Sequence, residues 1–134
     1  MPTRIKPPMG PDNGWWWDMA ADGKLGIQRC KDCGALRHPP RPMCGECNSL
    51  SWEPITASGL GTISSYTILR HPQFPGYEYP LIIILVDLEE GTRLTSQLVD
   101  CDPEDVDFNL PVRMRIHRDL DGFAIPVFTL AEVG

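Results

Sequence analysis

Short runs of alternating apolar and polar residues, separated by turn residues, fill the chain from residue 51 onward, and this period-two pattern predicts β-strands. The run 81–88 (LIIILVDL) is apolar at nearly every position and predicts a buried central strand, whereas 112–117 alternates apolar with charged residues, as a half-buried strand does. The predicted strands are 60–69, 81–88, 92–99, 112–117 and 123–130. Five strands with one irregular excursion, 100–111, favour a small Greek-key barrel of the OB type, with an SH3-like barrel or a small sandwich as the alternative.

The first fifty residues lack this alternation and begin with a proline-rich arm, 1–12. The stretch NGWWWDMAADG then predicts a short helix over about 14–22, capped at its start by Asp12 or Asn13 and ended by Gly23. A helix this short is marginal by itself, so it has to pack on the rest of the chain.

Three consecutive tryptophans, Trp15, Trp16 and Trp17, lie on this predicted helix. Consecutive helix residues point about 100° apart, so one apolar stripe cannot bury all three rings. We expect at least one ring to face solvent, a ligand or a partner. Two interpretations remain open: a helix clamped between neighbouring units with two rings buried, or a surface for a protein partner, where tryptophan is enriched.

Two Cys-x-x-Cys pairs form the most specific motif of the chain. Their four cysteines are Cys30, Cys33, Cys44 and Cys47. The two-residue gap lets a tight turn aim two sulfurs at one point, and the adjacent Gly34 and Gly45 allow the positive φ that such turns often need. Two such turns facing each other make a closed site of four thiolates, the pattern of a zinc ribbon, which predicts a structural rather than a catalytic metal. Zinc is favoured, with iron as the alternative for an all-thiolate site.

Disulfides are the competing interpretation of these cysteines, and they require an oxidising compartment. The start of the chain has no apolar segment typical of a signal peptide, and the longest apolar run, 81–86, is too short to cross a membrane. We therefore expect a cytoplasmic protein with free thiols and no membrane association. The fifth cysteine, Cys101, has no partner in sequence and is expected to be a small buried apolar residue.

Acidic residues outnumber basic ones, giving a net charge of −6, but the two kinds are unevenly distributed. Residues 1–45 hold seven Lys and Arg against four Asp and Glu, whereas residues 46–134 hold five against fourteen. An acidic barrel is a poor partner for nucleic acid. The basic residues around the cysteines form either a solvated surface or a site for an anionic group. They are Arg29, Lys31, Arg37 and Arg41.

The segment HPQFPGYEYP, 71–80, joins the first two predicted strands of the barrel and carries Phe74 and Tyr77. In an OB fold the loops between strands contribute to the binding face. Two interpretations stay open: the rings fold back onto the mouth of the barrel, or they are exposed for a ligand or a partner.

A tryptophan-rich helix, the ribbon IQRCKDCGALRHPPRPMCGECNS, the strand segment GLGTISSYTILRH and the closing segment GFAIPVFTL follow one another in this order. Together they resemble the zinc-ribbon OB-fold proteins that accompany thiolases and other acyl-CoA enzymes. The most specific part is the order Cys-x-x-Cys-Gly, Arg-x-Pro-Pro-Arg, Cys-x-x-Cys. The resemblance implies a mainly β chain with three parts: an N-terminal arm and short helix (1–23), a rubredoxin-like zinc ribbon (24–52) and a five-stranded OB-type barrel (53–134).

The resemblance further implies an accessory subunit, non-catalytic or auxiliary, in a stable complex with a thiolase-like or lipid-transfer-protein-like dimer. Because that dimer is two-fold symmetric, we expect two copies of each chain, a heterotetramer. There it helps to hold acyl-CoA, while the partner carries out condensation, thiolysis or retro-aldol cleavage, in one branch on steroid side chains. No Ser–His–Asp or Cys–His set is readable in the sequence, so no catalytic residue is assigned. A nucleic-acid-binding ribbon and OB module is the alternative function, and a self-sufficient enzyme is a third.

Two groups of binding residues are predicted. Arg37 and Arg41 flank a stiff Pro-Pro segment, and one of them is expected to contact the nucleotide end of an acyl-CoA, whose phosphates arginine binds in bidentate fashion. Large aromatic side chains commonly anchor protein interfaces. The expected anchors are Trp15, Trp16, Trp17, Phe74 and Tyr77.

Overall fold

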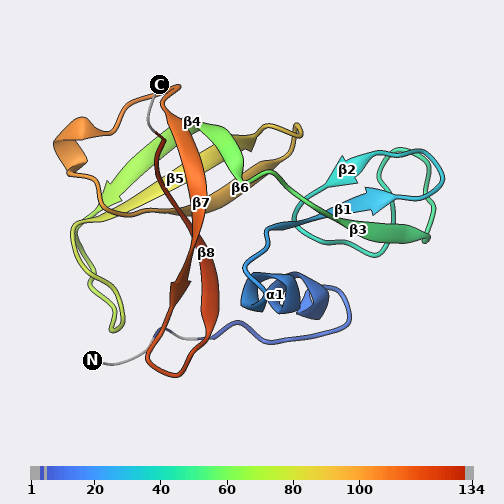
Figure 1. Cartoon of the computed structure of the whole chain (residues 1–134), viewed down its shortest axis with the longest axis horizontal. Helices are drawn as coiled ribbons and strands as arrows, with labels where there is room; N and C mark the ends of the chain where they lie inside the picture. Colours follow the sequence, from blue (N-terminus) through green and yellow to red (C-terminus); the bar gives the residue numbers. More distant parts are fainter. Residues whose placement is uncertain (1–3, 5, 132–134) are drawn as a thin grey trace.

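The structure of the protein is a computed structural model that describes residue 4 and residues 6–131. Within these residues, a short helix, α1 (Gly14–Ala21), precedes a three-stranded sheet and a closed five-stranded barrel (Figure 1). The small sheet, in the order β2-β1-β3, is made of β1 (Gly26–Cys30), β2 (Leu36–Arg37) and β3 (Trp52–Thr56). The barrel is made of β4 (Leu60–Leu69), β5 (Leu81–Leu88), β6 (Arg93–Leu98), β7 (Pro111–Arg118) and β8 (Ala124–Leu130), with a 3-10 turn, η1 (Pro103–Asp105), between β6 and β7. No helix in the described part of the chain is long and apolar enough to cross a membrane.

The barrel closes in the strand order β4-β5-β6-β8-β7, and β7 returns to pair with β4. All neighbouring strands are antiparallel except β6 and β8, which pair in parallel at Leu98 and Phe128. The predicted five-stranded barrel is therefore confirmed, and the predicted bounds of β4 and β5 match the observed ones. Pro126 of β8 pairs with Ile116 of β7 and lies outside the single pairing between β6 and β8.

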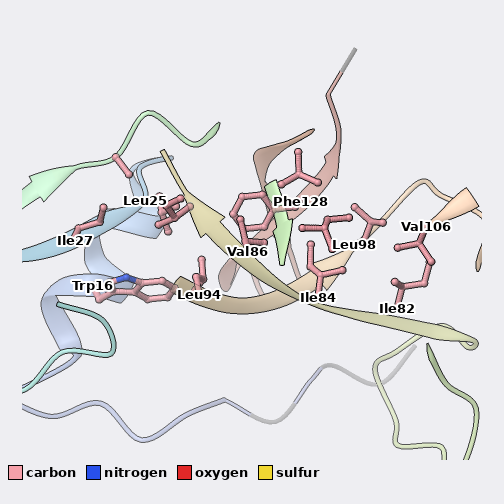
Figure 2. Close-up of a cluster of buried hydrophobic side chains, with 14 residues drawn as sticks. Trp16, Leu25, Ile27, Ile82, Ile84, Val86, Leu94, Leu98, Val106 and Phe128 are labelled. Atoms are coloured by element: carbon pink, nitrogen blue, oxygen red, sulfur yellow. The ribbon is translucent and has the colours of Figure 1, made fainter. Parts of the chain in front are cut away.

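Strand β5 is part of the barrel wall, and its inward side chains fill much of the core. Ile82, Ile84 and Val86 point inwards and are at most 3% exposed, and they pack with Phe128 of β8 (Figure 2). The alternate residue Ile83 points to the outer face and is only half-buried. The prediction of a buried strand thus holds for the inner face, while the outer apolar face is partly open.

The helix α1 lies between the small sheet and the barrel (Figure 1). Trp16 is buried, and its ring packs edge-on against Trp17 with centroids 4.7 Å apart. Trp17 is half-buried against Phe123, at 5.2 Å, and Trp15 is half-buried against Trp52, at 5.0 Å. This arrangement agrees with the clamped-helix interpretation, although one ring rather than two is fully buried.

The ends of α1 follow the sequence prediction in part. Gly23 has a φ of +82° directly after the helix, as a helix-ending glycine does. Asn13 precedes the helix, but its side chain makes no capping bond. Its Oδ1 instead accepts the N–H of Gly10 at 2.8 Å and so holds the N-terminal arm.

The boundary between ribbon and barrel, predicted between residues 52 and 53, falls within a strand. Strand β3 extends across it, because β3 pairs with β1 as far as Thr56.

Candidate functional site

The four cysteines of the two Cys-x-x-Cys pairs converge at the tip of the small sheet. All four sulfur atoms lie within 4.8 Å of one another. The Sγ atoms of Cys30 and Cys47 are 3.6 Å apart, and so are those of Cys33 and Cys44. Cys30 and Cys44 are buried, whereas Cys33 and Cys47 are exposed, so each pair contributes one buried and one exposed cysteine. The structure brings together every cysteine that the spacing predicted.

The two turns that carry the cysteines have the same hydrogen-bond pattern. In the first turn, the N–H of Gly34 donates to the carbonyl of Cys30, and in the second the N–H of Asn48 donates to that of Cys44, both at 2.9 Å. Gly34 has a φ of +79° and Asn48 a φ of +63°. The prediction for Gly34 is confirmed, but the prediction for Gly45 is wrong. The residue after the second cysteine takes the left-handed conformation in both turns, and asparagine tolerates it better than most residues do.

Backbone N–H groups and neighbouring sulfurs act unequally on the four thiols. The N–H of Cys33 is the largest influence on Cys30 and lowers its pKa to about 6, and the N–H of Cys47 likewise lowers the pKa of Cys44. The N–H of Ser49 acts in the same direction on Cys47, but the neighbouring sulfurs, Cys30 first, outweigh it and raise the pKa of Cys47 to about 12. Four thiolates at this spacing repel one another, so the full anionic set requires a bound cation.

The sulfur geometry fits a metal ion. A tetrahedral zinc with Zn–S distances of about 2.3 Å places its sulfur ligands roughly 3.8 Å apart. The observed 3.6 Å between the Sγ atoms of Cys30 and Cys47 is close to that value. Four soft thiolate donors suit zinc or iron, and they leave no position for a substrate or a water. The cluster is therefore a closed, structural metal site.

The loop between the two turns is held by buried polar side chains. Arg37 is 6% exposed, and its Nε and Nη2 donate to the carbonyl of Arg41 at 3.1 and 2.9 Å. Gln28 of β1, 2% exposed, bonds the same residue through both polar atoms of its side chain. Arg37 and Arg41 are thus adjacent, but they differ in exposure: the Arg41 side chain faces solvent and that of Arg37 is inside the loop.

Two further basic residues, Arg29 and Lys31, lie on either side of Cys30, next to the first cysteine turn. Arg29 forms a half-exposed ion pair with Glu53, whose Oε1 accepts from Arg29 Nε at 2.9 Å. Lys31 is exposed. The exposed cationic side chains on this surface are therefore those of Lys31 and Arg41.

A groove of about 490 Å³ lies on the outer face of the barrel, beneath the loop that joins β4 to β5. Strands β5, β6 and β8 form its floor, and α1 forms one wall. Four of the predicted interface aromatics line it: Trp16, Trp17, Phe74 and Tyr77. Trp15 does not, because it packs on Trp52 at the small sheet. Phe74 is 54% exposed, so its ring is half outside the groove.

Arg4 ties this loop to the barrel. Its Nε donates to the carbonyl of Gly76 at 3.2 Å, its Nη2 donates to Oε1 of Gln97 at 2.6 Å, and its guanidinium lies 4.3 Å from the centre of the Tyr77 ring. Sequence reasoning missed both Arg4 and Gln28. The partners of Arg4 lie 72 and 93 residues away along the chain, so no local pattern marks it. Gln28 could have been noticed as a polar residue within an apolar strand segment.

Comparisons with known proteins agree with this architecture. The family model described as the ChsH2 rubredoxin-like zinc ribbon domain matches residues 17–53, and the one described as the ChsH2 C-terminal OB-fold domain matches residues 55–117. One chain of the solved Ltp2-ChsH2(DUF35) aldolase structure is 38% identical, with a TM-score of 0.89, over 95% of this chain and 100% of that one. A DUF35-family protein of unknown function from Sulfolobus solfataricus is 18% identical with a TM-score of 0.63, over 91% of this chain and 87% of its own, and shows the fold alone.

Curated relatives include longer proteins. The probable enoyl-CoA hydratase alpha subunit of Thermomonospora curvata is 38% identical over 93% of this chain, and the 3-oxo-4,17-pregnadiene-20-carboxyl-CoA hydratase alpha subunit of Mycobacterium tuberculosis is 38% identical over 81%. This chain spans only 39% and 35% of their respective lengths. A DUF35 domain-containing scaffold protein of Methanocaldococcus jannaschii is 37% identical over 67% of this chain and 65% of its own.

Proposed function

This chain belongs to the DUF35 family of ChsH2-type proteins, which join a rubredoxin-like zinc ribbon to an OB-fold domain, and from this membership we propose that it is an accessory subunit of an acyl-CoA enzyme complex. The observation that carries the proposal is the match along the whole of a chain in the Ltp2-ChsH2(DUF35) aldolase. The names of two relatives as CoA hydratase alpha subunits and of a third as a scaffold protein support the same role.

The partner in this proposal is a thiolase-like subunit that carries out the chemistry, with retro-aldol cleavage of an acyl-CoA as the favoured reaction and condensation or thiolysis as related ones. The similarity to a chain of an aldolase and the steroid-CoA name of one relative support cleavage of a steroid side chain. The closed four-cysteine site supports an auxiliary role for this chain, because it offers no open coordination position for a substrate. Cysteines kept as thiols suit a reducing compartment such as the cytoplasm.

Zinc is the metal that we propose for the cysteine site. Its role is to join the two turns of the ribbon, and in this way to fix the loop that carries Arg37 and Arg41. Elemental analysis of protein purified without chelators tests this directly: one zinc per chain is expected, and iron in its place would correct the assignment.

We propose that Arg41 binds the nucleotide end of an acyl-CoA and that Arg37 positions Arg41. Arg41 is exposed, its backbone is fixed by Arg37 and Gln28, and a guanidinium suits phosphate. In the assembled complex, Arg41→Ala should raise KM for the CoA substrate more than it lowers kcat. Lys31→Ala, a change of an exposed cation on the same unit, is the control and should leave KM unchanged. An unchanged KM in Arg41→Ala removes Arg41 from the binding site.

The partner surface in this proposal includes the exposed rings Phe74 and Tyr77, which are 54% and 36% exposed. Trp16 and Trp17 lie beneath these two rings, and Trp15 contributes a half-buried ring at the small sheet, where it packs on Trp52. A two-fold symmetric partner dimer would bind two copies of this chain, giving a heterotetramer.

The experiment that tests the complex is purification of the tagged chain, expressed at its native level in its own host, followed by native mass spectrometry. A thiolase-sized subunit in a two-to-two assembly is the expected result. A monomer that converts an acyl-CoA without any partner would overturn the proposal and make the chain an enzyme in its own right.

A further inference from the structure

The outer face of β5 is apolar, but the protein covers it only in part. Residues of β5 alternate between the core and the outside, so Leu81, Ile83 and Leu85 face outwards while their neighbours fill the core. Ile83 and Leu85 remain half-buried rather than buried. Strands that are apolar on both faces are usually covered on both faces, so this stretch has room for another apolar group.

The space over this stretch is walled on several sides. The loop 70–80 arches over it with Phe74 and Tyr77, and α1 closes one side with Trp17. Strand β8 contributes the half-buried Ile125 and the buried Val127, next to the single pairing between β6 and β8. The volume of about 490 Å³ is within the range of small-molecule sites, and a walled groove suits a narrow ligand better than a flat protein surface.

Two of the polar side chains that border the groove are already engaged within the protein. Ser96 donates its hydroxyl hydrogen to the carbonyl of Pro126 at 2.9 Å, and Oε1 of Gln97 accepts from Arg4. Most of the groove's lining is apolar, so a ligand there gains mainly by burying apolar surface. Arg4 forms the end wall, and beyond it lies a separate cavity bordered by charged residues such as Arg115 and Asp119.

We propose that this groove binds the aliphatic part of the acyl group of an acyl-CoA, so that this chain selects the acyl group as well as helping to hold the coenzyme. The inference rests on the proposed function, because it takes acyl-CoA as the ligand of the complex. It adds that Ile83, Thr95 and Ile125 form the floor on which the acyl chain lies, with Trp17 and Tyr77 at its sides.

The test is calorimetric titration of the full-length, metal-loaded chain with free CoA and with acetyl-, butyryl-, hexanoyl- and octanoyl-CoA. Burial of each methylene in the groove should strengthen binding roughly fourfold. Thr95→Phe places a ring over the groove floor and should abolish this dependence on acyl length. Thr62→Phe is the matched control, since Thr62 is also an exposed threonine of a barrel strand but lies outside the groove. It should keep the full dependence.

Three results would overturn the inference. The first is equal affinity for free CoA and octanoyl-CoA, or no binding of either, by the wild-type chain. The second is unchanged length dependence in Thr95→Phe, which would place the acyl group elsewhere. The third is a wild-type chain that sediments as a dimer and shows no length dependence, together with a Thr95→Phe variant that sediments as a monomer. This pair of results would identify the groove as a contact between copies of this chain. None of these results bears on whether a thiolase-sized subunit co-purifies, so the proposed function fails or stands separately.

Discussion

Both polar atoms of the Gln28 side chain bond to the backbone of Arg41. Oε1 accepts the N–H of Arg41 and Nε2 donates to its carbonyl, each at 2.8 Å. Gln28 lies on β1 between the helix and the metal site, so this pair of bonds joins the strand to the loop between the two cysteine turns. The loop that carries the proposed anion-binding arginine is thereby fixed before any ligand binds.

Gln28→Leu should lower the free energy of unfolding by about 1–3 kcal/mol, because it keeps the side-chain volume but leaves the N–H of Arg41 without its partner, while the carbonyl of Arg41 still accepts from Arg37. Urea denaturation of the metal-loaded protein measures this. Gln73→Leu, at an exposed position, is the control and should change stability by no more than about 0.5 kcal/mol. Equal effects of the two changes would mean that the Gln28 bonds add nothing to stability.

Gly26 lies where α1 approaches β1 closely. A Cβ atom at this position would stand 2.7 Å from Sδ of Met19 and 2.9 Å from the ring of Trp15. Gly26→Ala should therefore destabilise the protein by about 1–3 kcal/mol through overpacking. Gly14→Ala, in α1 with no atom within 4 Å of the added Cβ, should instead stabilise by about 0.4–1 kcal/mol. Thermal unfolding of the two variants side by side should show shifts of opposite sign.

Loss of the metal should destabilise the small sheet. Cys44→Ser removes a buried ligand, and structural zinc contributes roughly 10–16 kcal/mol to folding in zinc-finger peptides. We expect Cys44→Ser to bind less than one metal per chain and to melt at lower temperature, as the wild type does after chelation. Cys101→Ser, a half-buried cysteine outside the cluster, should retain full metal content. Full metal content in Cys44→Ser would contradict the assigned ligand set.

His38 makes stability depend on pH. Burial lowers the pKa of His38 below its ordinary value of 6.5. The unfolded chain therefore binds a proton at a higher pH than the folded chain, and stability should fall as pH drops through 6.5 towards the lower folded pKa. His38→Gln should remove this part of the pH dependence, while His71→Gln, at an exposed position, should leave it in place. Parallel stability curves for wild type and His38→Gln between about pH 7 and 5.5 would contradict this prediction.

The sequence predicts this fold well where the signal is local. The apolar run of β5 and the cysteine spacing each depend on neighbouring residues, and both features are found where the pattern places them. Asn48 shows a limit of the same reasoning, because the glycine after Cys44 looked like the turn residue, whereas the turn needs its left-handed residue after Cys47.

Features that join distant parts of the chain could not be predicted. Arg4 meets Gly76 and Gln97 only after the barrel has closed, and the groove exists only because α1, the loop 70–80 and β8 come together. The three tryptophans illustrate the same point. Helix geometry correctly indicates that they cannot share one face, but which aromatic each ring meets is decided by the tertiary fold.

The central claim, that the exposed aromatic loop binds a thiolase-like subunit, is tested most directly by the dissociation constant between this chain and the subunit that co-purifies with it. Phe74 and Phe108 are 54% and 56% exposed, so their replacement by alanine removes similar surface at two different places. Phe74→Ala should weaken the complex about tenfold or more, as loss of an interface anchor does, and Phe108→Ala should leave it unchanged. An unchanged dissociation constant for Phe74→Ala would contradict the account.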